Sequence, residues 1–450
     1  MSEIDFEPES ALGEDPQWFD QDVSFEFDEE PNSEPLVVRS HFVTTVLVSH
    51  NGETWLPAVL TQLARTTRPP EVIVGVDARS TDTSLEILTQ SLGADRVVAL
   101  AENKGFGACV DAGLGLVPRP DFLADARPSD TIEWIWLLHD DCAPDSTALE
   151  RLLLTADRHP SVAILGPKIL GWHDRRVLLE VGVGITSDGR RVTGLEHGEL
   201  DQGQHDGDRD VLAVSSAGML VRRDIFDALG GFDPELPLFR DDLDLCWRAH
   251  RMGERVIVAT GSQVHHREAS KNGRRLDNQS HLGISRLLRA DREAAVHVLL
   301  AHSTGIAAVL IGLRLFLGSA IRSLGYLLGK DASAAGAEIG AVVSVILHPS
   351  RLRRSRTLVA ATSTEPASVV RHLRPSTWEQ IRSLGEAVAG LATTSGSTAN
   401  TLSALDSGPV DEDASYLEES SVGLVKRVLR KPSVVLIVLL TLIAVAATRS

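Results

Sequence analysis

Two adjacent carboxylates, Asp140 and Asp141, follow directly on the apolar run WIWLL, with one histidine, His139, in front of them. Keeping two like charges together costs free energy, and a divalent cation removes that repulsion while it also neutralises a diphosphate. Mg²⁺ and Mn²⁺ prefer oxygen ligands and are commonly shared between carboxylates and substrate phosphates. The alternative is that the pair caps the helix expected after Asp145, which explains one carboxylate more easily than two. The segment therefore indicates a metal and diphosphate site.

A second acidic group lies in LFRDDLDLCWRAHRMG, where Asp241, Asp242 and Asp244 begin an expected helix. Carboxylates in a first turn interact favourably with the helix dipole, which would be a structural role. Three of them within four positions exceed that need, and one that faces a site could act as a general base. Two neighbouring histidines, His265 and His266, follow the last expected strand, and in an extended chain only one of them can point into the site.

Short β-rich runs alternate with helical patterns from His41 to about Arg267, which predicts one α/β domain with a predominantly parallel sheet. The expected strands are His41–His50, Glu71–Asp77, Asp95–Leu100, Trp134–Asp141 and Arg255–Thr260, and a helix is expected at Trp55–Thr66. The fourth strand is apolar up to its acidic end, as expected of a central strand that is covered on both faces. Ligands of such sheets bind beyond the carboxyl ends of the strands, so the site is expected at that edge.

Polar residues gather at the ends of the first three strands as well. They are Ser49 and Asn51 in SHNG, Asp77, Arg79 and Asp82 in DARSTD, and Asn103, Lys104 and Gly105 in ENKGFG. The first turn carries no GxGxxG and no GxxxxGK[ST], which disfavours a dinucleotide-binding dehydrogenase and a phosphate-loop ATPase.

Composition excludes some classes of function. The formal net charge of −18 argues against general nucleic-acid binding, which requires clustered Lys and Arg. Much of that excess lies in Met1–Glu34, which has thirteen acidic residues and no Lys or Arg and predicts a disordered acidic tail. Three widely separated cysteines and the absence of a CxxC pair indicate neither a disulfide framework nor a structural zinc site, and a reducing cytoplasm fits best.

The segment after the α/β domain has a different character. Ala294–Leu313 carries no Asp, Glu, Lys or Arg, and the basic and apolar residues that follow it suit amphipathic helices in a membrane interface at least as well as a span. HPSRLRRSR supplies a basic cluster for anionic headgroups. Val434–Thr448 is apolar but short for a span, and indicates either a marginal anchor or the start of a longer membrane region. The expected organisation is an acidic tail (1–38), an α/β domain (39–290), membrane-associated helices (291–360), a linker with short helices (361–425), and a basic flank with an apolar segment (426–450).

The order of these motifs resembles the family 2 glycosyltransferases, inverting enzymes of the GT-A fold that use nucleotide-diphosphate sugars. The rhamnosyl- and galactofuranosyl-transferase-like branch, of an actinobacterial and membrane-associated type, is the most similar. The likeness spans about His41 to Ser270 and rests on VLVSHNG, IVGVDARSTD, NKGFG, LLHDDCAPD and the region from SSAGMLVRRD to AHRMG.

The resemblance implies roles for individual residues. Asp242 would be the general base, with Asp241 as the fallback, and Asp141 and His265 would ligate Mn²⁺ or Mg²⁺. The implied donor-binding residues are Ser49, Asn51, Asp77, Arg79, Asp82, Asn103, Lys104, Gly105, His139 and Asp140, and those on the acceptor side are Gly218, Trp247 and Arg248. Two positions depart from the family pattern. His139 stands at the first position of the DXD motif, where it could ligate the metal or only hydrogen-bond the donor, and Asp241 replaces the usual Glu.

The function implied by the resemblance is transfer of a sugar from a UDP- or dTDP-sugar to a glycan or lipid-linked acceptor in cell-envelope biosynthesis, at the cytoplasmic side of the membrane. Because no QxxRW follows the domain, a non-processive enzyme is expected. One alternative is a catalytically degenerate GT-A domain that binds nucleotide sugar or glycolipid as a membrane-tethered module, and His139 is its only support. A sugar nucleotidyltransferase is a weaker alternative, because SHNG lacks a Gly-rich nucleotide loop.

Overall fold

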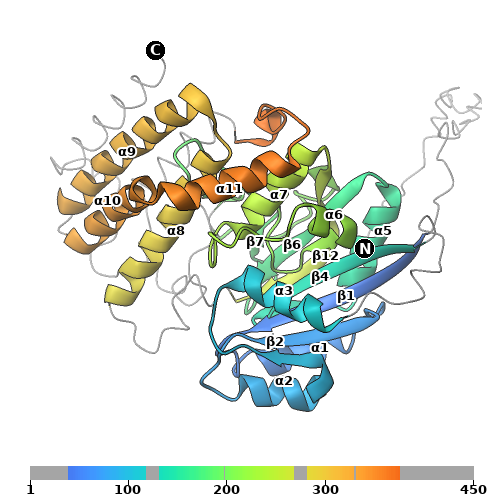
Figure 1. Ribbon diagram of the computed structural model, residues 1–450. Coiled ribbons are helices and arrows are strands. Elements are labelled where there is room, and N and C mark those ends of the chain that lie inside the picture. Colours follow the sequence, from blue (N-terminus) through green and yellow to red (C-terminus); the bar gives the residue numbers. More distant parts are fainter. Residues whose placement is uncertain (1–38, 118–130, 197, 268–280, 329–330, 376–450) are drawn as a thin grey trace, which may run out of the picture. The chain divides into compact units, whose positions relative to one another are not determined.

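The fold is built around one large mixed sheet, seen in a computed structural model (Figure 1). The structure describes residues 39–117, 131–196, 198–267, 281–328 and 331–375. All of these belong to one compact unit that begins at Val38. The predicted acidic tail and the apolar segment Val434–Thr448 lie outside the described residues, as does most of the predicted linker.

The described strands are β1 (Ser40–Ser49), β2 (Val72–Asp77), β3 (Val97–Ala99), β4 (Thr131–His139), β5 (Cys142–Pro144), β6 (Val162–Gly171), β7 (Leu178–Glu180), β8 (Gly184–Ile185), β9 (Arg191–Val192), β10 (Arg209–Asp210), β11 (Leu220–Arg222) and β12 (Arg255–His266). The described helices are α1 (Leu56–Leu63), α2 (Ser84–Leu92), η1 (Ala94–Arg96), α3 (Phe106–Leu116), α5 (Ala148–Arg158), α6 (Arg223–Ala228), α7 (Asp241–Met252), α8 (His281–Ala301), α9 (Gly305–Leu328), α10 (Ala332–Leu347), α11 (Pro349–Thr362) and η2 (Arg371–Leu373).

The main path of the sheet has the order β10-β12-β6-β11-β4-β1-β2-β3. The strands β3, β2, β1 and β4 are parallel, as expected from the alternating pattern. The short strand β11 runs antiparallel between β4 and β6, which makes the sheet mixed rather than wholly parallel. The parallel arrangement brings the carboxyl ends of β1, β2, β3 and β4 to one edge, where the site was expected.

The strand β4 is covered on both faces, as its sequence predicted. Ile135 and Leu137 pack into one hydrophobic cluster, and Trp134, Trp136 and Leu138 pack into a second cluster on the opposite face. A fully buried side chain of this size contributes about 1.5–3 kcal/mol relative to exposure. This burial holds the strand firmly and fixes the position of the acidic pair at its end.

Two features of the fold were not anticipated. The strand β6, a run of ten buried residues beside β12, had not been recognised in the sequence. The helix α8 runs without a break through the domain boundary expected at 290. The uncharged window Ala294–Leu313 is also divided, because α8 ends at Ala301 and α9 begins at Gly305.

The helices α8, α9 and α10 lie side by side, and α11 runs from them to α7 (Figure 1). Ion pairs tie this group to the α/β domain: Asp291 of α8 pairs with Arg240 at 2.9 Å, and Arg351 of α11 pairs with Glu235 at 2.7 Å. The helical group is therefore packed against the α/β domain.

One face of α9 is apolar and exposed. Side chains at helical spacing, from Ile306 (79% exposed) through Leu313 and Leu317 to Leu327, share that face. Among the described residues α9 is the one helix long and apolar enough to cross a membrane, and α10 with α11, bent by 71°, meet the same criterion as a pair. One such helix is weak evidence of a membrane span, whereas a continuous exposed apolar face is a common mark of an interaction surface.

Candidate functional site

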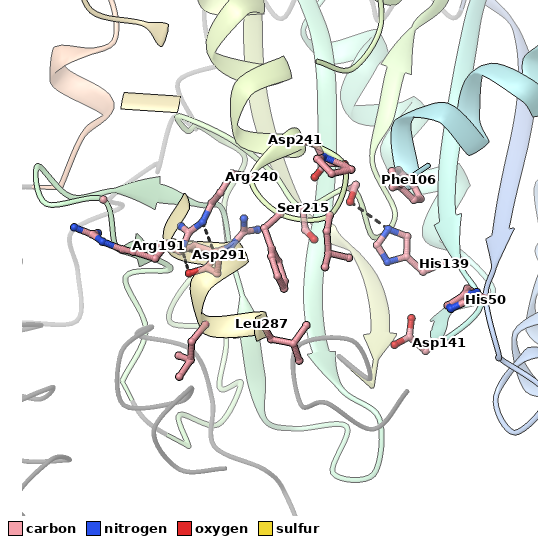
Figure 2. A pocket seen from close by; sticks show the side chains of 18 of the residues that line it. His50, Phe106, His139, Asp141, Arg191, Ser215, Arg240, Asp241, Leu287 and Asp291 are labelled. Carbon is pink, nitrogen blue, oxygen red and sulfur yellow. Dashed lines mark hydrogen bonds and ion pairs between the residues drawn. The ribbon is translucent and has the colours of Figure 1, made fainter. Parts of the chain in front are cut away.

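A cavity of about 290 Å³ opens at the carboxyl edge of the sheet. One wall comes from the ends of β1, β2 and β4 and the start of α3, and the other comes from α8, α9 and α10. Figure 2 shows His50, His139 and Asp141 on one side, Arg240 and Asp291 on the other, and Asp241 between them.

Asp141 is buried at the end of β4, where the sequence placed the metal site. Its Oδ1 atom lies 3.3 Å from Nε2 of His266. Ligand atoms of His139, Asp141 and His266 all lie within 4.8 Å of one another, which is close enough for one ion. The Nε2 atom of His139 is hydrogen-bonded to the Ser216 hydroxyl at 3.1 Å. Its ring also packs against that of Phe106, with the ring centroids 4.6 Å apart. One carboxylate and two imidazoles suit Mn²⁺ better than Mg²⁺, which demands oxygen ligands.

The structure brings His266 to this cluster instead of the predicted His265. The strand β12 pairs with β5, so that His266 is opposite Cys142 and next to Asp141. Its neighbour His265 points to the other face, where Nε2 lies 3.3 Å from the Asp145 carboxylate. Burial lowers the pKa of His265, with Arg175 adding to the effect. As expected, only one histidine of the pair faces the site, but it is the second one.

Asp140 holds the first loop in place. Its Oδ2 accepts hydrogen bonds from the Ser49 hydroxyl at 2.9 Å and from the His50 amide at 2.8 Å. A Cβ on Gly52 would lie 2.1 Å from the same oxygen, so only glycine fits there. The following helix α5 has Thr147 at its N-cap, and neither Asp140 nor Asp141 caps it. The capping interpretation is therefore wrong.

The predicted donor-binding residues fall into two groups. Asn103, Gly105, His139 and Asp140 line the cavity. Ser49, Asn51, Asp77, Arg79, Asp82 and Lys104 do not. Several of the second group connect loops: the side-chain Oδ1 of Asn51 accepts from the Thr81 amide at 2.8 Å, and the Asp82 carboxylate accepts from the Glu53 amide at 3.0 Å. Their contacts to a donor remain predictions.

The two carboxylates at the start of α7 have different surroundings. Asp242 is held by Arg191 through two hydrogen bonds, at 3.2 and 2.8 Å, and does not line the cavity. Asp241 does line the cavity, is 5% exposed, and its Oδ2 has no hydrogen-bond partner among the described residues. Burial, and then the neighbouring Asp242 carboxylate, raise the pKa of Asp241 above the usual range. A raised pKa and a free oxygen suit a general base, so the geometry favours the fallback assignment.

The residues predicted for the acceptor side lie elsewhere. Arg248 is fully buried, donates to Asp244 at 2.7 Å and also donates to the backbone of the loop after α6. Trp247 stacks on His302, which directly follows α8, with ring centroids 4.4 Å apart. Gly218 has a positive φ of 92°, and a Cβ there would lie 2.8 Å from Pro167, so the local backbone conformation requires glycine. None of the three lines the cavity, so their contacts to an acceptor stay a prediction.

Residues that sequence reasoning missed complete the other wall. They are Leu287, Leu288, Asp291 and Arg292 from α8, Arg322 and Tyr326 from α9, and Ala334, Ala337 and Glu338 from α10. Their positions depend on long-range ion pairs such as Arg240–Asp291 and Arg322–Glu338. No local pattern in the sequence signals such contacts.

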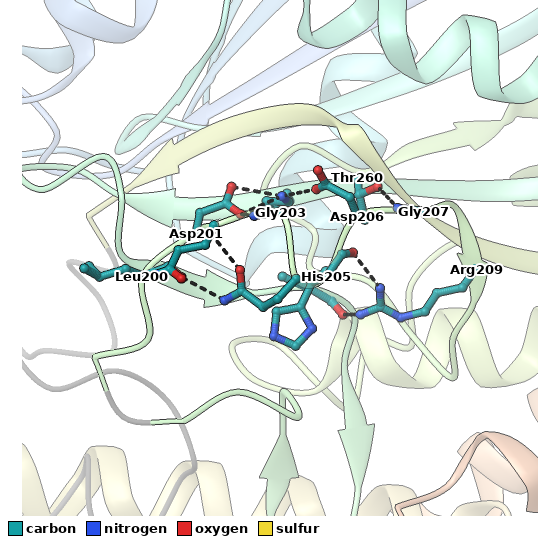
Figure 3. Close-up of polar contacts among 12 residues, drawn as sticks. Leu200, Asp201, Gly203, His205, Asp206, Gly207, Arg209 and Thr260 are labelled. Carbon is teal, nitrogen blue, oxygen red and sulfur yellow. Dashed lines mark hydrogen bonds and ion pairs between the residues drawn. The ribbon is translucent and has the colours of Figure 1, made fainter. Parts of the chain in front are cut away.

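A separate polar cluster lies around the loop after β9 (Figure 3). Lys168 is buried there, and its ammonium group donates to Asp201 and Asp206 at 2.9 and 2.6 Å. The Gly207 amide donates to the Thr260 hydroxyl at 2.9 Å. The lysine occupies the place that a cation would take between the carboxylates, so this cluster fastens the loop to β6 and β12.

A mixed sheet whose parallel strands are interrupted by the antiparallel β11, with acidic residues at the carboxyl end of β4, is the architecture of a nucleotide-sugar transferase domain of the GT-A type. The chain belongs to the family described as glycosyltransferase-like family 2, whose profile matches residues 41–280. It is therefore a glycosyltransferase, as the motif order implied.

Relatives and solved structures show what the chain is similar to. It is 23% identical to the N-acetylglucosaminyl-diphospho-decaprenol L-rhamnosyltransferase of Mycobacterium tuberculosis over 53% of this chain and 79% of that protein. It is 14% identical to GalNAc-T7 crystallised with UDP, GalNAc and Mn²⁺, with a TM-score of 0.40 over 59% of this chain and half of that one. It is 14% identical to the mannosyltransferase PcManGT of Pyrobaculum calidifontis, crystallised with GDP-Man and Mn²⁺. The TM-score is 0.38, over 76% of this chain and 91% of that one.

Proposed function

We propose that the protein is a metal-dependent, inverting and non-processive glycosyltransferase. It would move a sugar from a UDP- or dTDP-sugar to a glycan or lipid-linked acceptor in cell-envelope biosynthesis. The observation that carries the proposal is that three side chains with ligand atoms within 4.8 Å of one another and a buried carboxylate with a free oxygen line the same cavity.

The proposed ligand set is Asp141, His139 and His266. A bound Mn²⁺ would neutralise the charge of the nucleoside diphosphate as it leaves. His139 is already fixed by Ser216 and Phe106, so it can keep one orientation whether it ligates or hydrogen-bonds the donor.

Asp241 is the proposed general base. Its Oδ2 atom would accept the proton of an acceptor hydroxyl while that oxygen attacks the anomeric carbon, which inverts the configuration in a single displacement. Arg191 holds Asp242 in a bidentate ion pair, which keeps this second carboxylate away from the cavity. Arg240 and its partner Asp291 would close the acceptor side of the cavity beside the base.

The acceptor and the location are inferred from two observations. The Mycobacterium tuberculosis relative is named for a lipid-linked acceptor. The exposed apolar face of α9 and the exposed Arg353 at the start of α11 suit a membrane surface with anionic headgroups. We therefore place the catalytic domain on the cytoplasmic side of a membrane.

The test is donor binding followed by turnover. Thermal-shift screening of UDP-, dTDP- and GDP-sugars with Mn²⁺ should give one class that raises the melting temperature, because a ligand stabilises the state that binds it. The shift should vanish in Asp141→Asn and on adding EDTA. Binding of the donor without turnover on glycan or lipid-linked acceptors would instead support the degenerate binding module, and no donor binding at all would overturn the proposal.

A further inference from the structure

The helical wall of the cavity holds individual polar atoms that lack partners, although Arg292 as a whole pairs with Glu338 and donates through Nη1 to the Asp188 carbonyl oxygen. Arg292 of α8 is 8% exposed and Tyr326 of α9 is 5% exposed, and both line the cavity. Among the described residues, the Tyr326 hydroxyl and the Nη2 atom of Arg292 have no hydrogen-bond partner. A buried polar group without a partner costs about 1–3 kcal/mol. Such groups are tolerated where a ligand satisfies them.

The surroundings of Arg292 are cationic. Glu338 bridges Arg292 and Arg322, at 3.0 and 2.7 Å, and Asp188 lies near Arg322 at 3.4 Å and near Arg190 at 3.6 Å. Three guanidinium groups thus share two carboxylates in this network. Burial, and then the charge of Arg322, lower the pKa of Arg292 to about 10, which leaves it charged at neutral pH. Guanidinium groups recognise phosphate with particular strength.

The same wall is apolar next to these donors. Leu287, Leu288, Ala334 and Ala337 line the cavity beside Arg292 and Tyr326. The helix that carries Tyr326 also carries, on another face, the exposed apolar side chains from Ile306 to Leu327. A ligand whose phosphate lies at Arg292 would therefore find apolar surface for a hydrocarbon chain close by.

We propose that α8, α9 and α10 form the acceptor subsite, which binds an amphiphile with a phosphate or diphosphate group next to a hydrocarbon chain. Arg292 and the Tyr326 hydroxyl hold the phosphate, and the apolar wall takes the start of the chain. The inference rests on the proposed function for the identity of the reaction, but the site itself is separate from Asp141, His139 and His266.

The experiment measures binding of farnesyl diphosphate, farnesol and inorganic pyrophosphate to the full 450-residue chain in EDTA, which removes metal-dependent binding at the donor site. Farnesyl diphosphate should bind at least about tenfold more tightly than either pyrophosphate or farnesol. Arg292→Gln should weaken that binding by about tenfold or more and Tyr326→Phe by about threefold, as expected for a charged and a neutral hydrogen bond.

The matched control is Arg289→Gln, because Arg289 is exposed on the same helix and does not line the cavity. It removes the same charge and should leave the affinity within about twofold, as surface substitutions usually do. Should Arg292→Gln fail to fold, Tyr326→Phe carries the test, since it removes one oxygen atom that has no partner.

Three results would overturn the inference. Equal affinity for pyrophosphate would mean that the site binds free phosphate rather than an amphiphile. Equal affinity for farnesol would mean that the phosphate is not recognised, and unchanged binding in both variants would place the site elsewhere. Donor binding with Mn²⁺, measured on the same samples, separates the two proposals. If the wild type bound no donor with Mn²⁺, the proposed function would be overturned. Binding of farnesyl diphosphate in EDTA would still support this subsite.

Discussion

The two walls of the cavity differ in how their residues are held in position. The strand-end wall comes from short loops that follow β1, β2 and β4, so each of its residues is close in sequence to a buried strand. The helical wall comes from residues 287–338 and is held against the domain by ion pairs between distant residues, such as Arg240–Asp291. In our proposals the first wall holds the donor and the metal, and the second selects the acceptor. The comparison suggests that a common transferase domain gains its acceptor preference from the helices packed against it.

The largest expected effect lies where the walls meet. Asp241→Asn should lower kcat by about 10²–10⁴, the usual contribution of a general base, while donor affinity changes little. Asp242→Asn should retain more activity, because Asp242 pairs with Arg191 and does not line the cavity. Steady-state kinetics on both variants would measure kcat. A loss of turnover confined to Asp242→Asn would restore the assignment made from family resemblance.

Arg248 tests whether the predicted acceptor residue is structural. Arg248→Met removes one partner of a fully buried ion pair and should cost about 3–5 kcal/mol in the free energy of unfolding. Urea denaturation measures that cost. The folded fraction of the variant should keep the wild-type KM for the acceptor. A raised KM with unchanged stability would instead support a role of Arg248 in acceptor binding.

The two histidines test the strand-end wall. His266→Ala should weaken Mn²⁺ binding by about tenfold or more, with activity recovering as Mn²⁺ is raised. His265→Ala should leave Mn²⁺ affinity unchanged, because His265 points to Asp145. Isothermal titration with Mn²⁺ gives both affinities, and equal losses in the two variants would contradict the register of β12.

The raised pKa of Asp241 makes a prediction about stability. A carboxyl whose pKa is higher in the folded state stabilises the fold at low pH, and that stabilisation is lost as the pH rises through the folded pKa. Asp241→Asn should therefore be more stable than the wild type near neutral pH, and the difference in melting temperature should shrink in acid. Thermal unfolding over a pH series would show it. A variant that is less stable at every pH would mean that Asp241 has a stabilising partner.

The smallest effect concerns the exposed face of α9. Leu313→Gln and Leu317→Gln should each lower partition to anionic phosphatidylglycerol vesicles by about fivefold, since each removes part of an apolar side chain worth about 1.5–3 kcal/mol when buried. Flotation of the vesicles measures the partition. Leu85→Gln on α2 is the matched control, because Leu85 is also an exposed leucine but lies outside α9. Unchanged partition in both α9 variants would separate α9 from the membrane.

Part of this molecule could be predicted from its sequence. Buried strands of alternating or continuous apolar residues, and the polar residues at their ends, follow from hydrophobic burial and from the geometry of a parallel sheet. That reasoning singled out Asp141, His139 and the start of α7, which the structure brings together around one cavity.

The remainder depended on geometry that short-range patterns do not encode. The register of β12 shifts between Ala259 and Gln263, so counting alternate residues along the strand cannot tell which histidine faces the site. Similarly, the choice between Asp241 and Asp242 depends on Arg240, which has a positive φ of 66°, and on Arg191, fifty-one residues away from Asp242. The helical wall likewise depends on ion pairs between distant residues, with Asp291 51 residues from Arg240 and Arg351 116 residues from Glu235.

The central claim is that Asp141, His139 and His266 form a metal site in the cavity that Asp241 lines. The most direct measurement is pulsed EPR of Mn²⁺ bound to the protein, which detects the nuclear spin of a ligating imidazole nitrogen. Nitrogen coupling is expected in the wild type and in His265→Ala, with a reduced signal in His266→Ala and no tightly bound Mn²⁺ in Asp141→Asn. Mn²⁺ that binds the wild type without any nitrogen coupling, or that binds Asp141→Asn equally well, would contradict the account.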